Sequence, residues 1–380
     1  MPMKHQTVAS QYVIHHLSQR SQRQYSVLTG RAAAGIWAAL MAWGFHDQVV
    51  LIPANSCYIV LWAVLKSGNH PLLVDVDRRT GNVTVEGLNT HLSSHPAAVI
   101  PCHMYGLPAP MQTICEWAQA NGVKVIEDAA LALGAMVDGQ PAGSWGDASI
   151  VSFGLGKIVD NQIGGALLTD DASLATSVAT FITDAPVWDD HLMMLTNQWN
   201  GLYWPLHQYE AQNAGLVQLY PQLFALYGDL TAYQLAADDW ADMPTLLRDL
   251  PHNLSHRTRL AALYDLQLGI TTMSADTSTL ILPLLRPAGH ILWRYPLLVQ
   301  PAIRDELLAY LWEQGVHEAT RWYPPLRPMT ASLAPYILQP KTPAAEMLGA
   351  SIINLPLDEN VDANDVHDIS AYIQEFLADI

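Results

Sequence analysis

Between residues 28 and 170, short β-rich runs alternate with segments of helical period, and this alternation constrains the fold more than any other feature. The β-rich runs are residues 49–52, 72–74, 98–101, 124–126, 149–153 and 166–168, and helical segments are residues 31–43, 58–67 and 111–120. This pattern is typical of βαβ units, in which helices cover both faces of a sheet. We therefore predict an α/β fold with a mostly parallel sheet.

The length of 380 residues suits two domains rather than one small core. We expect a large domain over residues 1–245 and a smaller C-terminal α+β domain over residues 246–380. A helical stretch at about 230–266 should lead into the second domain. There we expect strands near 280–284 and 295–299, and helices near 304–314 and 363–377.

Residues 185–228 are rich in aromatic side chains, among them Trp188, Trp199 and Trp204. They could form a surface for a partner or substrate. We favour an insertion whose aromatic side chains pack locally, since scattered apolar side chains are common on protein surfaces.

The formal net charge of −17 excludes several classes of partner. It repels nucleic acid and anionic membranes, which bind clustered Lys and Arg. A phosphate site would have to be built locally, from backbone N–H groups and a few cations. Cys57, Cys102 and Cys115 form no CxxC pair, and their odd number argues against a disulfide framework or a zinc knuckle. Without an apolar leader or an apolar run of about 18 residues, the chain is expected to be soluble and cytoplasmic.

Polar residues follow several of the predicted strands, where ligands bind in sheets of this kind. They are Asn55, Ser56, Asp75, His103, Glu127, Asp128, Ser152 and Lys157. We expect one site built from several strand ends.

Familiar nucleotide and metal motifs are incomplete. Gly156 and Lys157 resemble the end of a P-loop, but Ile158 follows where Ser or Thr would bind magnesium. Gly30 and Gly35 do not complete GxGxxG. No metal site is expected.

Lys157 and Asp128 form the most informative pair. Lys157 follows an apolar strand and lies among glycines, where an amine could be desolvated and become nucleophilic toward an aldehyde. Asp128 ends a strand of buried character, where a carboxylate needs a cationic partner such as a protonated pyridine. Taken singly, Lys157 could be a solvated loop lysine and Asp128 a helix N-cap.

Two long blocks, residues 101–130 and 143–165, resemble the DegT/DnrJ/EryC1/StrS family of sugar aminotransferases, which depend on pyridoxal 5'-phosphate (PLP). Residues 304–316, 321–326 and 354–360 are similar to the family's C-terminal domain. The resemblance implies the aspartate aminotransferase (type I) fold, with a seven-stranded sheet, and a homodimer.

By this resemblance Lys157 forms the internal aldimine and carries the proton of the 1,3-shift, Asp128 pairs with the ring nitrogen, and Ser152 binds the phosphate. The turn at Gly30, Arg31 and Ala32 would hold the phosphate at a helix N-terminus.

The sequence departs from the family around the ring. Cys57 replaces the stacking aromatic residue, unless Tyr58 takes its place, and Leu131 replaces the Gln that contacts the phenolic oxygen. Asp229 stands where relatives carry an Arg that reaches the neighbouring subunit. Arg31 replaces a neutral Thr, and we hypothesise that its guanidinium supplies the charge missing at Asp229.

The expected reaction moves an amino group from an amino acid, with glutamate as the donor, to a nucleotide-linked keto sugar. Arg294, Arg321 and Tyr323 are candidates for substrate contact, with an interface or core role as the alternative. A dehydratase of the same family is disfavoured because those enzymes carry His in place of Lys157. A regulatory or interaction scaffold that has lost the chemistry is the other alternative.

Overall fold

The computed structural model describes residues 7–209, 218–269, 281–330, 333, 337–338 and 340–379. Its strands are β1 Tyr25–Thr29, β2 Val49–Pro53, β3 His70–Val74, β4 Ala98–Val99, β5 Lys124–Asp128, β6 Met136–Val137, β7 Gln140–Pro141, β8 Ala148–Ser152, β9 Gly165–Thr169, β10 Ile281–Pro283, β11 Tyr295–Val299 and β12 Ile352–Leu355. Its helices are α1 Val8–Ser21, α2 Ala32–Ala42, α3 Tyr58–Lys66, α4 Val85–Asn89, α5 Met111–Asn121, α6 Ala172–Thr183, α7 Asp190–Tyr209, α8 Tyr220–Tyr227, α9 Met243–Gln267, α10 Arg304–Glu313, α11 Leu326–Thr330, α12 Pro343–Ser351 and α13 Ala363–Ala378.

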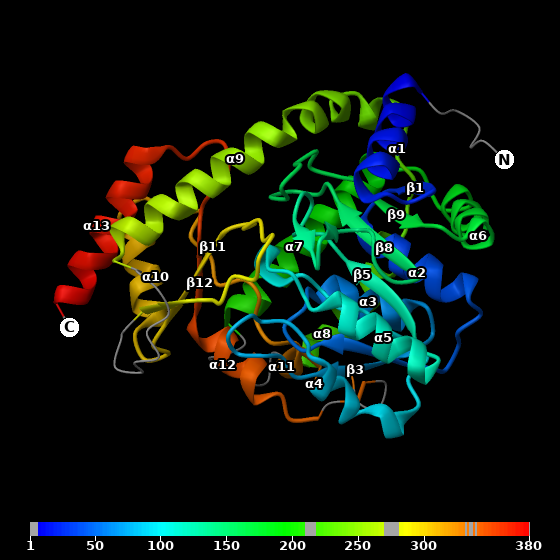
Figure 1. The fold of residues 1–380 in the computed structure, drawn as a ribbon, viewed down its shortest axis with the longest axis horizontal. Coiled ribbons are helices and arrows are strands. Elements are labelled where there is room, and N and C mark those ends of the chain that lie inside the picture. Colours follow the sequence, from blue (N-terminus) through cyan, green and yellow to red (C-terminus); the bar gives the residue numbers. More distant parts are fainter. Residues whose placement is uncertain are drawn as a thin grey trace.

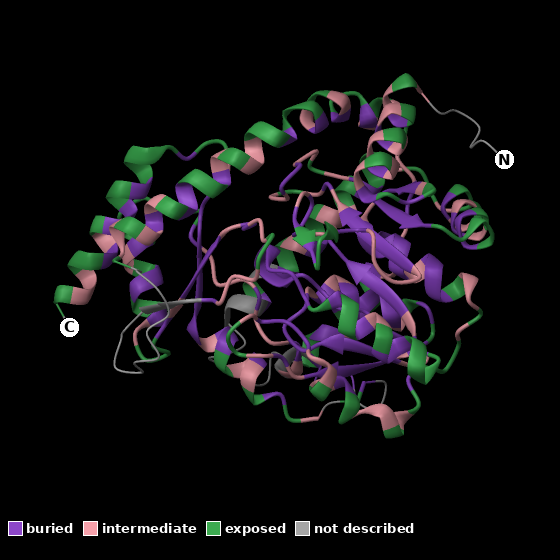
Figure 2. Ribbon diagram, in the orientation of Figure 1, coloured by how far each residue is buried: buried purple, intermediate pink, exposed green. Residues whose placement is uncertain are grey.

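The large sheet has seven strands in the order β1-β9-β8-β5-β4-β2-β3, which confirms the predicted α/β class. Strands β8, β5, β4, β2 and β3 are parallel to one another, and β9 runs antiparallel to both of its neighbours. These strands are almost wholly buried (Figure 2), because helices pack against the sheet. Strand β1 is the one member that the β-rich runs did not indicate.

A three-stranded antiparallel sheet, β10-β11-β12, forms the core of the C-terminal part together with α10 and α13. The long helix α9 runs between the two parts and packs on α1 at one end and on α13 at the other (Figure 1). No helix among the described residues is both long and apolar enough to cross a lipid bilayer.

Helix α9 begins later than predicted. Residues 230–242 were expected to be helical, but Pro244 lies in the first turn of α9, a position that suits proline. The segment before it is extended around Tyr233 and Gln234, because Tyr233 O accepts from Gly30 N at 2.9 Å and Gln234 pairs with Val187.

The described aromatic side chains of residues 185–228 pack against neighbouring elements. Trp199 and Tyr203 of α7 are 3% and 0% exposed and lie against Tyr58 and Trp62 of α3. Trp188 packs on Tyr233, with ring centroids 4.8 Å apart. The side chain of Trp204 lies outside the described residues.

Candidate active site

The carboxyl ends of β5 and β8 carry the central residues of the site. These strands are parallel neighbours, so Asp128 and Ser152 end at the same edge of the sheet. Cys102, which forms an isolated bridge with Asp128, places its Sγ 3.4 Å from Asp128 Oδ2. Cys57 lies at the start of α3, after β2.

Asp128 is a buried carboxylate, 8% exposed, without a cationic hydrogen-bond partner among the described residues. Ala130 N donates to Asp128 Oδ1 at 2.9 Å. Burial raises the pKa of Asp128, although the Ala130 N–H and the nearby Lys157 oppose this shift. The carboxylate would therefore be stabilised by a cation brought close to it.

Lys157 projects from a tight loop after β8. Asp160 fixes this loop, because its Oδ2 accepts from Gly156 N at 2.7 Å and Gly156 adopts a φ of +74°. No hydrogen bond joins the Lys157 amine to any of the described residues. Burial lowers the pKa of Lys157, while Cys57 and Asp128 oppose this shift. A larger fraction of the amine is thus unprotonated and nucleophilic than in a solvated lysine.

Trp293 forms a wall beside Lys157, and sequence reasoning missed it. Its Nε1 donates to Gly156 O at 2.6 Å, and its ring centroid lies 6.0 Å from Lys157 Nζ. Arg294 lies 5.3 Å from the same ring, and Tyr323 stacks on it at 5.9 Å. The only sequence signal for Trp293 was its position next to Arg294, because Trp293 lies far from Lys157 along the chain.

The three candidates for substrate contact separate in the structure. Tyr323 is 6% exposed and lies near Cys57 and Asp128. Burial contributes most to the raised pKa of Tyr323, and the charges of Cys57 and Asp128 raise this pKa further. Arg294 lines a cavity next to Lys157. Arg321 lies elsewhere, with its Nη1 3.8 Å from Asp305 of α10.

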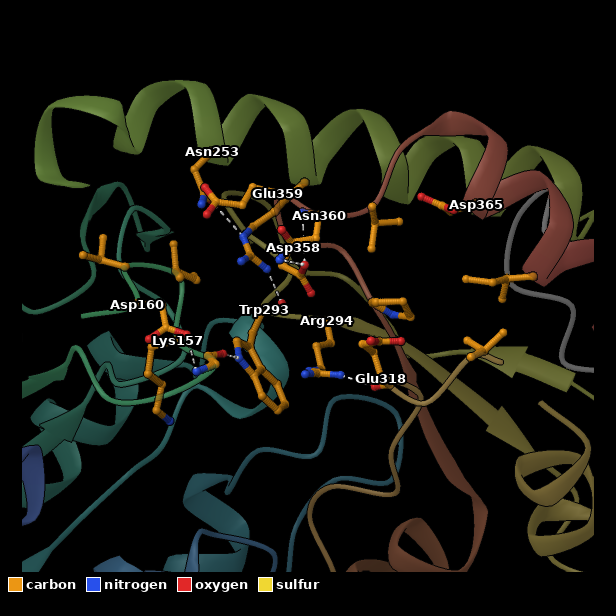
Figure 3. Close-up of a pocket in the computed structure, with 18 of the residues that line it drawn as sticks. Lys157, Asp160, Asn253, Trp293, Arg294, Glu318, Asp358, Glu359, Asn360 and Asp365 are labelled. Carbon is orange, nitrogen blue, oxygen red and sulfur yellow. Dashed lines mark hydrogen bonds between the residues drawn. The ribbon is translucent and has the colours of Figure 1, made fainter. Parts of the chain in front are cut away.

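The cavity has a volume of about 590 Å³ and lies between the Lys157 loop, α9 and residues 356–361. Figure 3 shows Lys157 and Trp293 side by side at one edge, with Arg294 and Glu318 beyond Trp293. Its lining mixes carboxylates and amides with two arginines: Asp160, Asp249, Asn253, Arg257, Arg294, Glu318, Asp358, Glu359 and Asn360. Such a lining suits a ligand with many hydrogen-bonding groups.

Several of the polar strand-end residues form hydrogen bonds within the scaffold. Glu127 is fully buried and accepts from Gly143 N, Trp145 N and His103 Nε2, each at 2.8 Å. Ala109 N donates to His103 Nδ1, so the His103 proton resides on Nε2.

Two further strand-end residues have structural partners as well. Asp75 accepts from Ala344 N and Ala345 N at the start of α12. Asn55 donates to Gly81 O at 2.9 Å and is fully buried. Neither side chain is therefore free to bind a ligand through these groups.

The turn before α2 carries Gly30, Arg31 and Ala32. A Cβ on Gly30 would lie 2.1 Å from Tyr233 Cδ2, so only glycine fits at this position. Arg31 precedes α2 and directs its guanidinium to the hydroxyls of Tyr227 and Tyr233. Leu131, three residues after Asp128, is 6% exposed. The side chain of Asp229 lies outside the described residues.

PLP fits the chemistry of these residues. Among the described residues Asp128 is a buried acid with no cationic hydrogen-bond partner, and the pyridine nitrogen of PLP can supply one. Lys157 is a desolvated amine on the same site, and PLP carries an aldehyde. Among the described residues, no cluster of three or more His, Cys, Asp or Glu side chains is arranged to hold a metal ion.

Comparison with known proteins agrees with this chemistry. A dTDP-4-dehydro-2,3,6-trideoxy-D-glucose 4-aminotransferase of Saccharopolyspora spinosa is 26% identical over 95% of this chain and 86% of its own length. A UDP-N-acetyl-3-dehydro-alpha-D-glucosamine 3-aminotransferase of Acidithiobacillus ferrooxidans is 41% identical over 34% of this chain and 36% of its own. The fold is similar to the crystal structure of a DegT DnrJ EryC1 StrS aminotransferase from Brucella abortus, with a TM-score of 0.76, 22% identity, and coverage of 97% of this chain and 90% of that one.

The family model of the DegT/DnrJ/EryC1/StrS aminotransferases matches residues 15–190, which include both Asp128 and Lys157. Residues 15–190 of the chain are therefore similar to the DegT/DnrJ/EryC1/StrS aminotransferase family, and the chain is an enzyme that uses PLP to transfer amino groups.

Proposed function

We propose that this enzyme moves an amino group from an amino acid, with glutamate as the first donor to test, to a nucleotide-linked keto sugar. The observation that carries the proposal is the buried carboxylate of Asp128 beside the half-buried amine of Lys157, whose pKa is lowered by burial. The sugar class is supported by the names of the two relatives, which act on a dTDP-linked and a UDP-linked keto sugar.

Each residue has a distinct task in this proposal. When bound, PLP withdraws electrons from the carbon that gains or loses the amine. Asp128 would hold the pyridine nitrogen in its protonated form, since a cation at this position relieves the cost of the buried carboxylate. Lys157 would attach the cofactor through Nζ and then carry a proton between carbon atoms as a general acid and base. Ser152, half-buried at the end of β8, would bind the phosphate.

The cavity beyond Trp293 would receive the acceptor sugar. Its carboxylates and amides can accept hydrogen bonds from sugar hydroxyls, and Arg294 can meet a phosphate. Tyr323 would contact the substrate on the Cys57 side of the site. We also expect a homodimer, the commonest oligomer.

Lys157 disfavours a dehydratase, because the resemblance assigns His at that position to such enzymes. The intact Asp128, Ser152 and Lys157 likewise disfavour a scaffold without chemistry.

Two half-reactions test the proposal. Glutamate should convert the bound cofactor to its amine form, with loss of the absorption band of lysine-bound PLP. A dTDP- or UDP-linked keto sugar should then restore the band. Failure of a panel of amino acids to change the spectrum would contradict transamination, whereas success with amino acids and failure with keto sugars would contradict the sugar acceptor.

A further inference from the structure

Arg31 forms no ion pair with an acidic side chain of the described residues. Its Nε donates to Tyr233 Oη at 3.3 Å and its Nη1 donates to Tyr227 Oη. Its Cζ also lies 5.3 Å from the centroid of each of these two rings. Within the part of the chain that the structure describes, the arginine ion pairs involve Arg23, Arg79, Arg286, Arg304, Arg321 and Arg327, and not Arg31.

The two tyrosines position the guanidinium without neutralising it. Burial raises the pKa of Tyr227 to about 12, so its hydroxyl is uncharged at neutral pH. Tyr227 and Tyr233 are 1% and 2% exposed, and Arg31 lies half-buried against them. An uncompensated guanidinium in such a place is costly unless an anion joins it.

The location of Arg31 indicates which anion its guanidinium binds. Arg31 directly precedes α2 and forms a backbone bridge with Gly164, whose O accepts from Phe153 N, the residue after Ser152. Arg31 therefore lies next to the end of β8, which carries residues that fit PLP, and its charge also opposes the rise in the pKa of Cys57. Tyr233 is held there by its backbone, because Gly30 N donates to Tyr233 O and Gly30 has no Cβ to prevent this approach.

We propose that Arg31, clamped by Tyr227 and Tyr233 of the same chain, binds the phosphate of PLP. The proposal rests on the proposed function of the site. A guanidinium forms charge-assisted, bidentate hydrogen bonds with phosphate, and each tyrosine that accepts from Arg31 keeps its own O–H to donate. The positive charge of the phosphate site is then supplied within one chain, so the site does not depend on a partner's arginine.

Binding of PLP is compared with binding of pyridoxal, which has the same ring and aldehyde and lacks the phosphate. Dissociation constants for the apo-protein are measured by fluorescence titration for the wild type and for Arg31→Thr, Arg31→Lys, Tyr227→Phe and Tyr233→Phe. Arg31→Thr should weaken PLP binding by at least about tenfold, equivalent to about 1.4 kcal/mol, and change pyridoxal binding by less than about twofold. Arg31→Lys should lose less PLP affinity than Arg31→Thr. Each Phe variant should weaken the binding of PLP and leave the binding of pyridoxal nearly unchanged.

Three results would overturn the proposal. One is a loss of PLP affinity below about threefold in Arg31→Thr, which is under about 0.7 kcal/mol. Another is an equal loss for PLP and pyridoxal, which is expected if the cluster only supports the fold. The third is a wild type that binds neither compound, in which case the proposed function fails too. If Arg31→Thr does not fold, as judged by circular dichroism, the same comparison in the two Phe variants decides, because these variants keep both rings.

Discussion

Replacing Glu127 tests whether the strand end that carries Asp128 is held by a buried carboxylate. Glu127→Ala removes the acceptor of three hydrogen bonds of 2.8 Å and leaves the N–H groups of Gly143, Trp145 and His103 buried. A buried donor left without its acceptor costs about 1–3 kcal/mol, so the loss of three acceptor contacts together costs at least about 3 kcal/mol. We expect Glu127→Ala to lower the free energy of unfolding by that amount. Glu127→Gln should lower it by less, because one side-chain oxygen can still accept hydrogen bonds.

The assay is urea unfolding of the apo-protein followed by tryptophan fluorescence. Glu116→Ala is the matched control, because Glu116 is exposed on α5 and bonds only Gln112 Nε2 among the described residues. The control should leave the unfolding midpoint unchanged. A loss of less than about 1 kcal/mol in Glu127→Ala would refute the reasoning, because a single ordinary hydrogen bond accounts for that much.

Two further substitutions probe the site. Burial places the folded pKa of Asp128 above its unfolded value, so ionised Asp128 destabilises the fold at pH values above the folded pKa, and this cost fades as the pH falls through it. Asp128→Asn should therefore raise the thermal midpoint of the apo-protein at pH 7 while abolishing transamination, and a lower midpoint would contradict this. Gly30→Ala should lower both the thermal midpoint and the PLP affinity, because its Cβ would lie 2.3 Å from Tyr233 O. Gly201→Ala in α7, where no side chain or distant backbone atom lies within 4 Å of the new Cβ, should lower neither quantity, and an equal loss in both alanine variants would argue against the Tyr233 contact.

Local periodicity was enough to predict most of the large sheet. Apolar runs such as residues 49–52 and 124–126 became β2 and β5 because both faces of a parallel strand are buried. Strand β1 lacked this signal, since it lies at the sheet edge and Tyr25 is exposed. The start of α9 was misjudged because the Tyr233 segment pairs with Gly30 and residues 186–188, which sequence spacing does not reveal.

The two sequence blocks identified Asp128 and Lys157 as site residues. The residues that surround them in space could be found only from the three-dimensional structure. Glu127 and Asp128 look equivalent in the sequence, but successive residues of a strand point to opposite faces, so Glu127 supports the Gly143 loop. Trp293 reaches Lys157 from the C-terminal part of the chain. Arg321 contacts Asp305 instead of the site, because its position depends on how α10 packs.

Mapping the lysine that binds PLP would show whether Lys157 holds the cofactor. The apo-protein is loaded with PLP, the bound cofactor is fixed by borohydride reduction, and the modified peptide is identified by mass spectrometry. Lys157 is one of five lysines, and Lys124, which pairs with Asp147, serves as the internal control. We expect modification at Lys157 and loss of the lysine-bound PLP absorption band in Lys157→Ala. Modification at another lysine, or a band that persists in Lys157→Ala, would contradict it.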